Sequence, residues 1–230
     1  MANLLQSLRW KFVRTIYASH NDSAPVQDAI RRCLGELQDG DIGLNVGAGT
    51  TRLHQAIINY DLLPGPAIDC TGRAERLPFA DNSFSVVISQ ETLEHVADPF
   101  EAVREICRTM RPGGVFYCQV PFVIGYHPGP TDYWRFTKEG IQRLVEQGGL
   151  LCESVAVTVG PGTGFYRILV EFFATVLSRP FPRVYLYVKG ALALFFYPVK
   201  WLDGVLYNGK QVDRIAGGYY AIARKLPSPE

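Results

Sequence analysis

The feature that most constrains the fold is an alternation between short apolar runs and an amphipathic helical segment. Four runs have the length of buried strands, at residues 42–46, 56–60, 84–89 and 115–120. Between the last two, residues 99–110 place Phe100, Val103 and Ile106 at helical spacing, and Arg111-Pro112-Gly113-Gly114 ends this segment. Strands joined through helices at this spacing predict an α/β protein with a parallel sheet.

The flanking regions extend this pattern in both directions. Residues 137–148 are typical of another helix, and residues 150–159 and 218–224 are typical of two more strands. Near the N-terminus, residues 3–18 carry leucines at helical spacing, and residues 21–25 stop one helix and cap the next. The sequence therefore predicts two N-terminal helices before the sheet and a last strand near the C-terminus.

An aromatic-rich region interrupts the predicted core. Residues 165–207 hold two apolar stretches separated by Arg179-Pro180-Phe181-Pro182. The second is about as long as a bilayer span of roughly 20 residues, but Lys189, Pro198 and Lys200 interrupt it, which favours two packed helices. Two interpretations stay open for this region: a cap over a substrate pocket or the core of the insertion itself, and a surface for membrane contact or a homodimer. The predicted domains are N-terminal helices at 1–40, a core at 41–160 and 215–226, and a helical insertion at 161–214.

Composition and charge exclude several classes of function. The chain has 23 basic and 22 acidic residues, so no overall field attracts a polyanion, and we expect no nucleic-acid partner. The five cysteines are scattered and odd in number, which favours reduced thiols, and the scattered histidines predict no metal site. Arg9, Lys11 and Arg14 lie within the N-terminal apolar stretch, unlike a signal peptide. We expect a cytoplasmic protein, with peripheral contact at the inner membrane face if the aromatic region binds lipid.

A glycine loop follows the first predicted strand. Gly47 and Gly49 allow a ligand to approach the backbone, and Asp61 follows the second strand, where a carboxylate can accept hydrogen bonds from ribose hydroxyls. A dinucleotide fingerprint would need a third glycine where Arg52 stands. Only about twelve residues separate Gly49 from Asp61, which leaves little room for a crossover helix. These two observations disfavour a nicotinamide cofactor, so a nicotinamide oxidoreductase is a weak hypothesis for this chain.

Further motifs in the same region resemble one known family. They are Asn45-Val46-Gly47-Ala48-Gly49-Thr50, Leu77-Pro78-Phe79, Asp81-Asn82-Ser83-Phe84, Leu93-Glu94-His95-Val96, Asp98-Pro99 and Arg111-Pro112-Gly113-Gly114. Together they resemble the class I S-adenosylmethionine-dependent methyltransferases, in the type 11-like branch, closely over residues 41–122. The resemblance implies a Rossmann-like, doubly wound, seven-stranded sheet. This sheet would be mostly parallel, with an antiparallel last strand, a shortened first crossover and a helical insertion before the last strand.

The resemblance also implies S-adenosyl-L-methionine as cofactor and a set of contacts to it. The implied positions are Asn45, Gly47, Ala48, Gly49, Asp61, Ala74, Ser89, Gln90 and Glu91. Two positions depart from the family pattern: Asn45 replaces a common acid, and Arg73 stands near the place of an aspartate that contacts adenine. Asp69 or Glu75 would have to supply the missing hydrogen-bond acceptor for the adenine amino group, and the Ala74 amide could reach the adenine ring.

The loop after the fifth strand is the candidate acceptor side. His127, Asp132 and Arg135 offer an imidazole, a carboxylate and a guanidinium there. One hypothesis makes His127 a general base, oriented by Asp132, with Arg135 holding an acidic group of the acceptor. In the other hypothesis, Asp132 caps a turn and pairs with Arg135, while Tyr133 and Trp134 pack beneath the insertion. His95 is interpreted as structural or as part of the cofactor rim.

We thus expect methyl transfer to a hydroxyl of a small, lipid-type or saccharide acceptor, assisted mainly by alignment and exclusion of water. The alternative is a non-catalytic cofactor-binding protein that docks to a membrane or a protein partner through residues 165–207.

Overall fold

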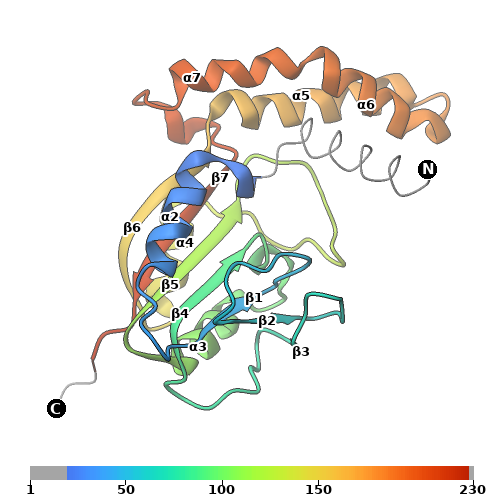
Figure 1. The fold of residues 1–230 in the computed structure, drawn as a ribbon. Coiled ribbons are helices and arrows are strands. Elements are labelled where there is room, and N and C mark those ends of the chain that lie inside the picture. Colours follow the sequence, from blue (N-terminus) through green and yellow to red (C-terminus); the bar gives the residue numbers. More distant parts are fainter. Residues whose placement is uncertain (1–19, 228–230) are drawn as a thin grey trace. The chain divides into compact units, whose positions relative to one another are not determined.

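The computed structural model describes residues 20–227 and contains one seven-stranded sheet with helices on both faces (Figure 1). The strands are β1 (Gly43–Val46), β2 (Ile57–Asp61), β3 (Cys70–Thr71), β4 (Phe84–Gln90), β5 (Met110–Pro121), β6 (Leu151–Val159) and β7 (Gly218–Arg224). Their order across the sheet is β3-β2-β1-β4-β5-β7-β6. The order reverses beside β1, so the carboxyl ends of β1 and β4 form the switch point where such sheets bind ligands.

The strand directions confirm the predicted Rossmann-like sheet. β1 pairs in parallel with both β2 and β4, and β4 pairs in parallel with β5. β7 runs antiparallel to β5, with Tyr117 opposite Ile222. The link between β1 and β2, all of which the structure describes, contains no helix, as the shortened first crossover requires.

Two details of the sheet differ from the sequence prediction. β3 is only two residues long, too short to leave an apolar pattern, so the resemblance implied a strand between β2 and β4 but the sequence did not locate it. β5 begins at Met110 rather than near residue 115, so Arg111-Pro112-Gly113-Gly114 lies within the strand. The pairing with β4 shifts register between Phe84 and Val86, which accommodates these extra residues as an irregularity.

Three helices of the core lie where the sequence predicts them: α2 (Ala24–Leu34), α3 (Pro99–Thr109) and α4 (Lys138–Gln147). A short 3-10 helix that the sequence did not predict, η2 (Leu93–His95), follows β4. α2 buries Val26, Ala29 and Ile30 against residues of β4 and β5 such as Val86 and Tyr117. α3 begins at Pro99 because the Asp98 carboxylate accepts a hydrogen bond from the Glu101 amide. The first predicted helix, residues 3–18, lies outside the described residues.

The aromatic-rich region forms a second compact unit, made of residues 157–217 with 20–23 and 123–125, while residues 24–122, 126–156 and 218–227 form the first. Its elements are α5 (Pro161–Ser178), η3 (Pro182–Val184), α6 (Tyr185–Phe195), η4 (Tyr197–Leu202), α7 (Asp203–Leu206) and η5 (Val212–Arg214), and η1 spans His20–Asp22. The predicted pair of packed helices is thus present as α5 and α6. Among the described residues, every helix falls short of the length and apolar character that crossing a bilayer needs.

Polar contacts fix the helices of this second unit. The Asp203 carboxylate accepts hydrogen bonds from the amides of Gly162 (2.6 Å) and Thr163 (3.1 Å), so it caps the N-terminus of α5. Glu171 of α5 pairs with Lys189 of α6 at 2.6 Å. The buried Tyr166 hydroxyl donates to the Ala193 carbonyl at 3.0 Å, which ties the middle of α5 to α6.

Candidate functional site

A pocket of about 300 Å³ opens at the carboxyl ends of the parallel strands, entirely within the first unit. Loops that follow β1, β2, β3 and β4 line it, together with the loop after β5. The lining residues are 46–47, 60–63, 72–75, 91–92, 95–97, 129–131 and 133. Because these loops follow strands that meet at one edge of the sheet, the fold brings together residues up to 87 positions apart.

Gly47 forms the floor of the pocket next to β1. Its φ is +74°, and a Cβ atom at this position would lie 2.0 Å from Thr92 Oγ1. Both facts require glycine, because other residues rarely adopt this backbone conformation and the space is already filled. Gly49 also has a positive φ of +54°, without such crowding.

Asp61 ends β2 and lines the pocket beside Gly47. Its Oδ2 accepts a hydrogen bond from the Gly49 amide at 2.9 Å, and its Oδ1 accepts one from the Leu63 amide at 3.1 Å. The glycine loop therefore fixes the orientation of this carboxylate. Each carboxylate oxygen retains a further lone pair, so Asp61 can still accept hydrogen bonds from a ligand.

The segment after β3 forms the opposite wall. The Arg73 guanidinium pairs with Glu75 at 2.8 Å, and the Tyr60 hydroxyl donates to the Arg73 carbonyl at 3.0 Å. Ala74 lines the pocket between them. Of the two acids considered as adenine acceptors, Glu75 lines the pocket, whereas Asp69 binds Arg52 at 2.7 Å outside the lining.

The predicted cofactor residues separate into two groups. Those that line the pocket are Gly47, Asp61, Ala74 and Glu91. The others lie outside the lining: Asn45, Ala48, Gly49, Ser89 and Gln90. Asn45 is buried within β1 and donates to Asn59 Oδ1 at 3.4 Å, so its side chain contributes to the sheet interior.

His127, Asp132 and Arg135, the predicted catalytic residues, lie together in the loop after β5. Asp132 Oδ1 and Oδ2 lie 2.5 and 2.6 Å from the Arg135 guanidinium, which holds the pKa of that carboxyl well below its usual range. Asp132 Oδ2 also accepts from the His127 amide at 2.9 Å. The turn and ion pair of the second hypothesis are therefore present. The pocket lining, as the described residues define it, includes none of the three.

The same loop docks on the turn after β4. The amides of Tyr133 and Trp134 donate to the Glu94 carbonyl, at 2.8 and 3.2 Å, and Trp134 Nε1 donates to the Val96 carbonyl at 3.0 Å. Through these contacts the loop and η2 build one wall of the pocket, to which His95 and Tyr133 contribute side chains.

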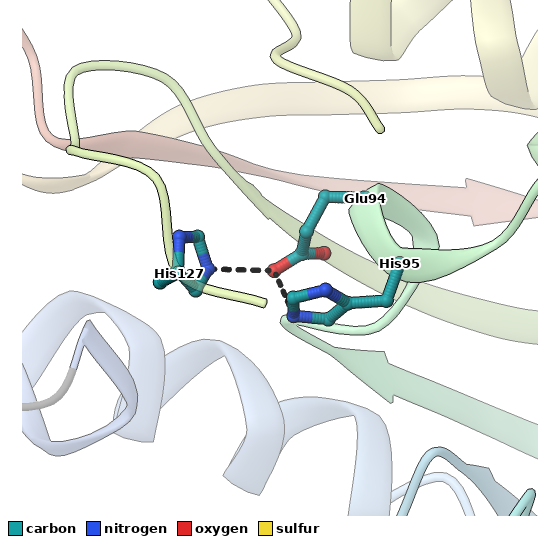
Figure 2. A group of neighbouring side chains, drawn as sticks. All are labelled: Glu94, His95 and His127. Atoms are coloured by element: carbon teal, nitrogen blue, oxygen red, sulfur yellow. Dashed lines mark ion pairs between the residues drawn. The ribbon is translucent and has the colours of Figure 1, made fainter. Parts of the chain in front are cut away.

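Glu94 is a fully buried carboxylate between two imidazoles (Figure 2). Its Oε1 lies 3.6 Å from His95 Nε2 and 3.8 Å from His127 Nε2. Burial raises the pKa of Glu94 to about 7. The sequence does not reveal Glu94 as a site residue, because an acid in a short turn is ordinarily exposed and only the three-dimensional fold brings loop 127–135 over it.

Comparisons with known proteins agree on the kind of domain. Residues 41–118 match the family model described as a methyltransferase domain. The chain is 34% identical over 103 residues to a ubiquinone biosynthesis O-methyltransferase of Methylobacterium sp. (strain 4-46), covering 37% of this chain and 40% of that protein. It is 38% identical over 106 residues to a probable S-adenosylmethionine-dependent methyltransferase of Mycolicibacterium smegmatis, covering 45% of this chain and 41% of the relative. The chain thus matches about two fifths of the length of these relatives.

Solved structures share the fold at low sequence identity. A complex of the Haloferax volcanii Trm112 methyltransferase activator with a methyltransferase gives a TM-score of 0.56 at 17% identity, covering 96% of this chain and 97% of that chain. A phosphoethanolamine N-methyltransferase of Haemonchus contortus, in complex with phosphomonomethylethanolamine and S-adenosylhomocysteine, gives a TM-score of 0.54 at 15% identity. The match covers 94% of this chain and 56% of that chain. At such identities these structures support the fold alone.

Proposed function

We propose that the protein is a class I S-adenosylmethionine-dependent methyltransferase, which transfers a methyl group from S-adenosyl-L-methionine to a hydroxyl of a small, lipid-type or saccharide acceptor. The match of residues 41–118 to a methyltransferase domain and the two relatives support this proposal. The observation that carries this proposal is the pocket at the carboxyl edge of the sheet, where Gly47 and Asp61 lie side by side. The relative named as an O-methyltransferase supports oxygen as the acceptor atom.

The residues of the pocket fit the cofactor. Gly47 leaves backbone accessible where a side chain would collide with Thr92, and the Asp61 carboxylate offers acceptors for two ribose hydroxyls. Ala74 and Glu75 provide an amide and a carboxylate for the adenine, and Glu91 provides a carboxylate for the amino group of the methionine part. When bound, the cofactor supplies an electrophilic sulfonium methyl group.

The chain's own contribution to transfer would be alignment and exclusion of water. Leu62, Leu63 and Tyr133 give the pocket apolar surface, which suits an amphipathic acceptor better than a highly charged one. Holding the reactants in line removes most of the entropic barrier to displacement. The base role of His127 and the acceptor-binding role of Arg135 stay hypotheses, and an unchanged pH–rate profile in His127→Ala would remove the first.

Calorimetry with S-adenosylmethionine and S-adenosylhomocysteine tests cofactor binding, the step that the methyltransferase and the non-catalytic alternative have in common. We expect one binding site for each ligand on the full chain. Incubation of cell extracts with methyl-labelled cofactor, followed by mass spectrometry, then tests transfer to an acceptor of any class. Binding without any labelled product would support the non-catalytic alternative, and no binding at all would contradict both.

The second unit favours one additional function, contact with a membrane surface. Residues 165–207 expose large apolar side chains, among them Leu186 (74%), Tyr187 (81%), Phe195 (73%) and Trp201 (71%). Arg179 and Arg183, both exposed, lie among them in the sequence and could contact lipid phosphates. Such a concentration of exposed aromatic surface is typical of a membrane or protein interface.

Flotation with vesicles of anionic lipid tests this function. We expect the protein to float with the vesicles and the double variant Tyr187→Glu/Phe195→Glu to stay at the bottom of the gradient. Leu226→Glu, at an exposed apolar position of the other unit, is the matched control and should still float. A wild-type protein that does not float but elutes as a dimer would instead support self-association through this surface.

A further inference from the structure

The Glu94 carboxylate is the most unusual buried group of the described residues. Glu94 is 0% exposed, and within the described part of the chain neither of its oxygen atoms has a hydrogen-bond partner. A buried carboxylate is costly unless a counter-charge or donor compensates it. A group that balances Glu94 is therefore expected within reach of Oε1, on the side where the two imidazoles lie (Figure 2).

The distances around Glu94 suit a shared cation better than hydrogen bonds. The separations of 3.6 Å to His95 Nε2 and 3.8 Å to His127 Nε2 exceed the usual hydrogen-bond range. Two ligands that bind one tetrahedral ion at about 2.1 Å each are about 3.4 Å apart. The three candidate ligand atoms all lie within 4.8 Å of one another, so small side-chain movements would bring them onto one ion.

The outer nitrogens of both imidazoles face oxygen acceptors. His95 Nδ1 contacts the Thr131 carbonyl oxygen, and His127 Nδ1 lies 3.5 Å from Asp132 Oδ2. A metal-bound histidine typically donates its other N–H to a carbonyl or carboxylate, which fixes the tautomer that leaves the inner nitrogen available, and His95 already has this arrangement. At His127 the Arg135 guanidinium donates from Nη2 to Nδ1 at 3.2 Å, and it also pairs with both oxygens of Asp132. Metal binding at His127 Nε2 therefore requires Arg135 to turn wholly to Asp132, so that Nδ1 can carry the proton and donate it to Asp132 Oδ2.

We propose that Glu94, His95 and His127 bind one divalent transition-metal ion of the Zn²⁺ class. Two imidazoles and one carboxylate are ligands that this class prefers, and a fourth position would be left for water or another ligand. The sequence prediction of no metal site considered spacing along one helix, whereas here His95 and His127 come from η2 and from the loop after β5.

The ion would join the two segments that build one wall of the pocket. His95 lines the pocket, and the backbone contacts of Tyr133 and Trp134 already hold the loop against Glu94. Metal binding would add a stronger connection at the same place and so position Tyr133 over the pocket. This inference does not depend on methyl transfer, because binding of the ion is measured directly.

The test uses the full chain, stripped of metal by a chelator and then titrated with Zn²⁺ or Co²⁺. We expect one equivalent to bind, visible absorption bands of Co²⁺ with nitrogen and oxygen ligands, and a melting temperature about 5 °C higher or more at saturating Zn²⁺. X-ray absorption of the Zn²⁺ protein should show two imidazoles. Binding of less than a tenth of an equivalent, or a spectrum without imidazole, would overturn the proposal.

Variants separate this site from adventitious binding. Glu94→Gln keeps the shape of the side chain and His127→Asn shortens the other ligand, and each should weaken Zn²⁺ binding on the order of 100-fold or more. Glu139→Gln and His54→Asn, at exposed positions outside the cluster, are the matched controls and should bind as the wild type does. Equal binding by Glu94→Gln and wild type would refute the site, and the Co²⁺ spectrum of the wild type decides the question if a variant fails to fold.

Discussion

Gly47 is a position in the pocket lining that tolerates only glycine. Its positive φ and its closeness to Thr92 act together, and both follow from the tight turn that leaves β1. The sequence predicted this glycine as part of a ligand loop, and in the structure it lines the pocket. It could not predict the contact with Thr92, because that residue is 45 positions away and reaches the loop only through the pairing of β1 with β4.

Gly47→Ala and Gly40→Ala separate the two effects. Gly40 also has a positive φ, +84°, but a Cβ atom there meets nothing within 4 Å. We expect about 1 kcal/mol of destabilisation in Gly40→Ala from backbone strain alone, and at least about 2–3 kcal/mol in Gly47→Ala, since the Thr92 side chain must also move. Chemical denaturation measures both. Equal losses would show that the contact with Thr92 relaxes without cost.

Asp61→Asn tests the carboxylate of the pocket. The variant keeps the size of the side chain but loses the charge and one of two acceptor oxygens, so we expect S-adenosylmethionine to bind roughly 10- to 100-fold more weakly. Isothermal calorimetry provides the measurement, and Asp39→Asn, at an exposed position between α2 and β1, provides the control. Unchanged affinity in Asp61→Asn would remove this residue from the proposed site.

At the scale of elements, most of the sheet was predictable because strand and helix periods leave clear patterns. β4 and α3 are examples: an uninterrupted apolar run, and a capped amphipathic helix that begins at Pro99. The position of the short β3 and the early start of β5 were missed, because their pairing depends on neighbouring strands rather than on their own residues. The cluster around Glu94 was missed for the same reason, since loop 127–135 buries it from a distance in the sequence.

The cap of α5 gives a prediction for the second unit. Asp203→Ala removes a carboxylate that accepts from two amides and from the Thr163 hydroxyl. We expect a loss of about 1–2 kcal/mol in the free energy of unfolding, with a smaller loss in Asp203→Asn, which keeps one acceptor oxygen. Thermal denaturation followed by circular dichroism compares the two. An alanine variant as stable as wild type would mean that water replaces the cap.

At the scale of the whole molecule, Lys200 links stability to pH. Desolvation by burial lowers the pKa of Lys200 to about 8, although its ammonium lies 5.0 Å from the Tyr197 ring centroid. Between about pH 8 and the ordinary lysine pKa, the folded chain has lost this proton while the unfolded chain retains it. Unfolding then takes up a proton, so stability should rise with pH in this window.

Lys200→Met tests this link by removing the titrating group. We expect the variant to be about 1–2 kcal/mol more stable than wild type at pH 7, a value discounted for partial exposure, and to lose the rise between about pH 8 and 10. Denaturant titrations across this range measure the difference. Lys210→Met, at an exposed position of the same unit, should leave the pH dependence as it is. A rise that persists in Lys200→Met would assign it to another group.

The position of the second unit within the chain has a consequence for modularity. It is inserted between β6 and β7, two strands that are neighbours in the sheet, and the Gly217 amide donates to the Val159 carbonyl at 3.0 Å where the chain leaves and returns. Because entry and exit lie beside each other, a short hairpin turn could in geometry replace the whole excursion. The amino-acid sequence of the inserted helices can therefore change without altering the strands of the sheet. We expect the pocket to constrain the sequence of the first unit and a binding surface to constrain that of the second.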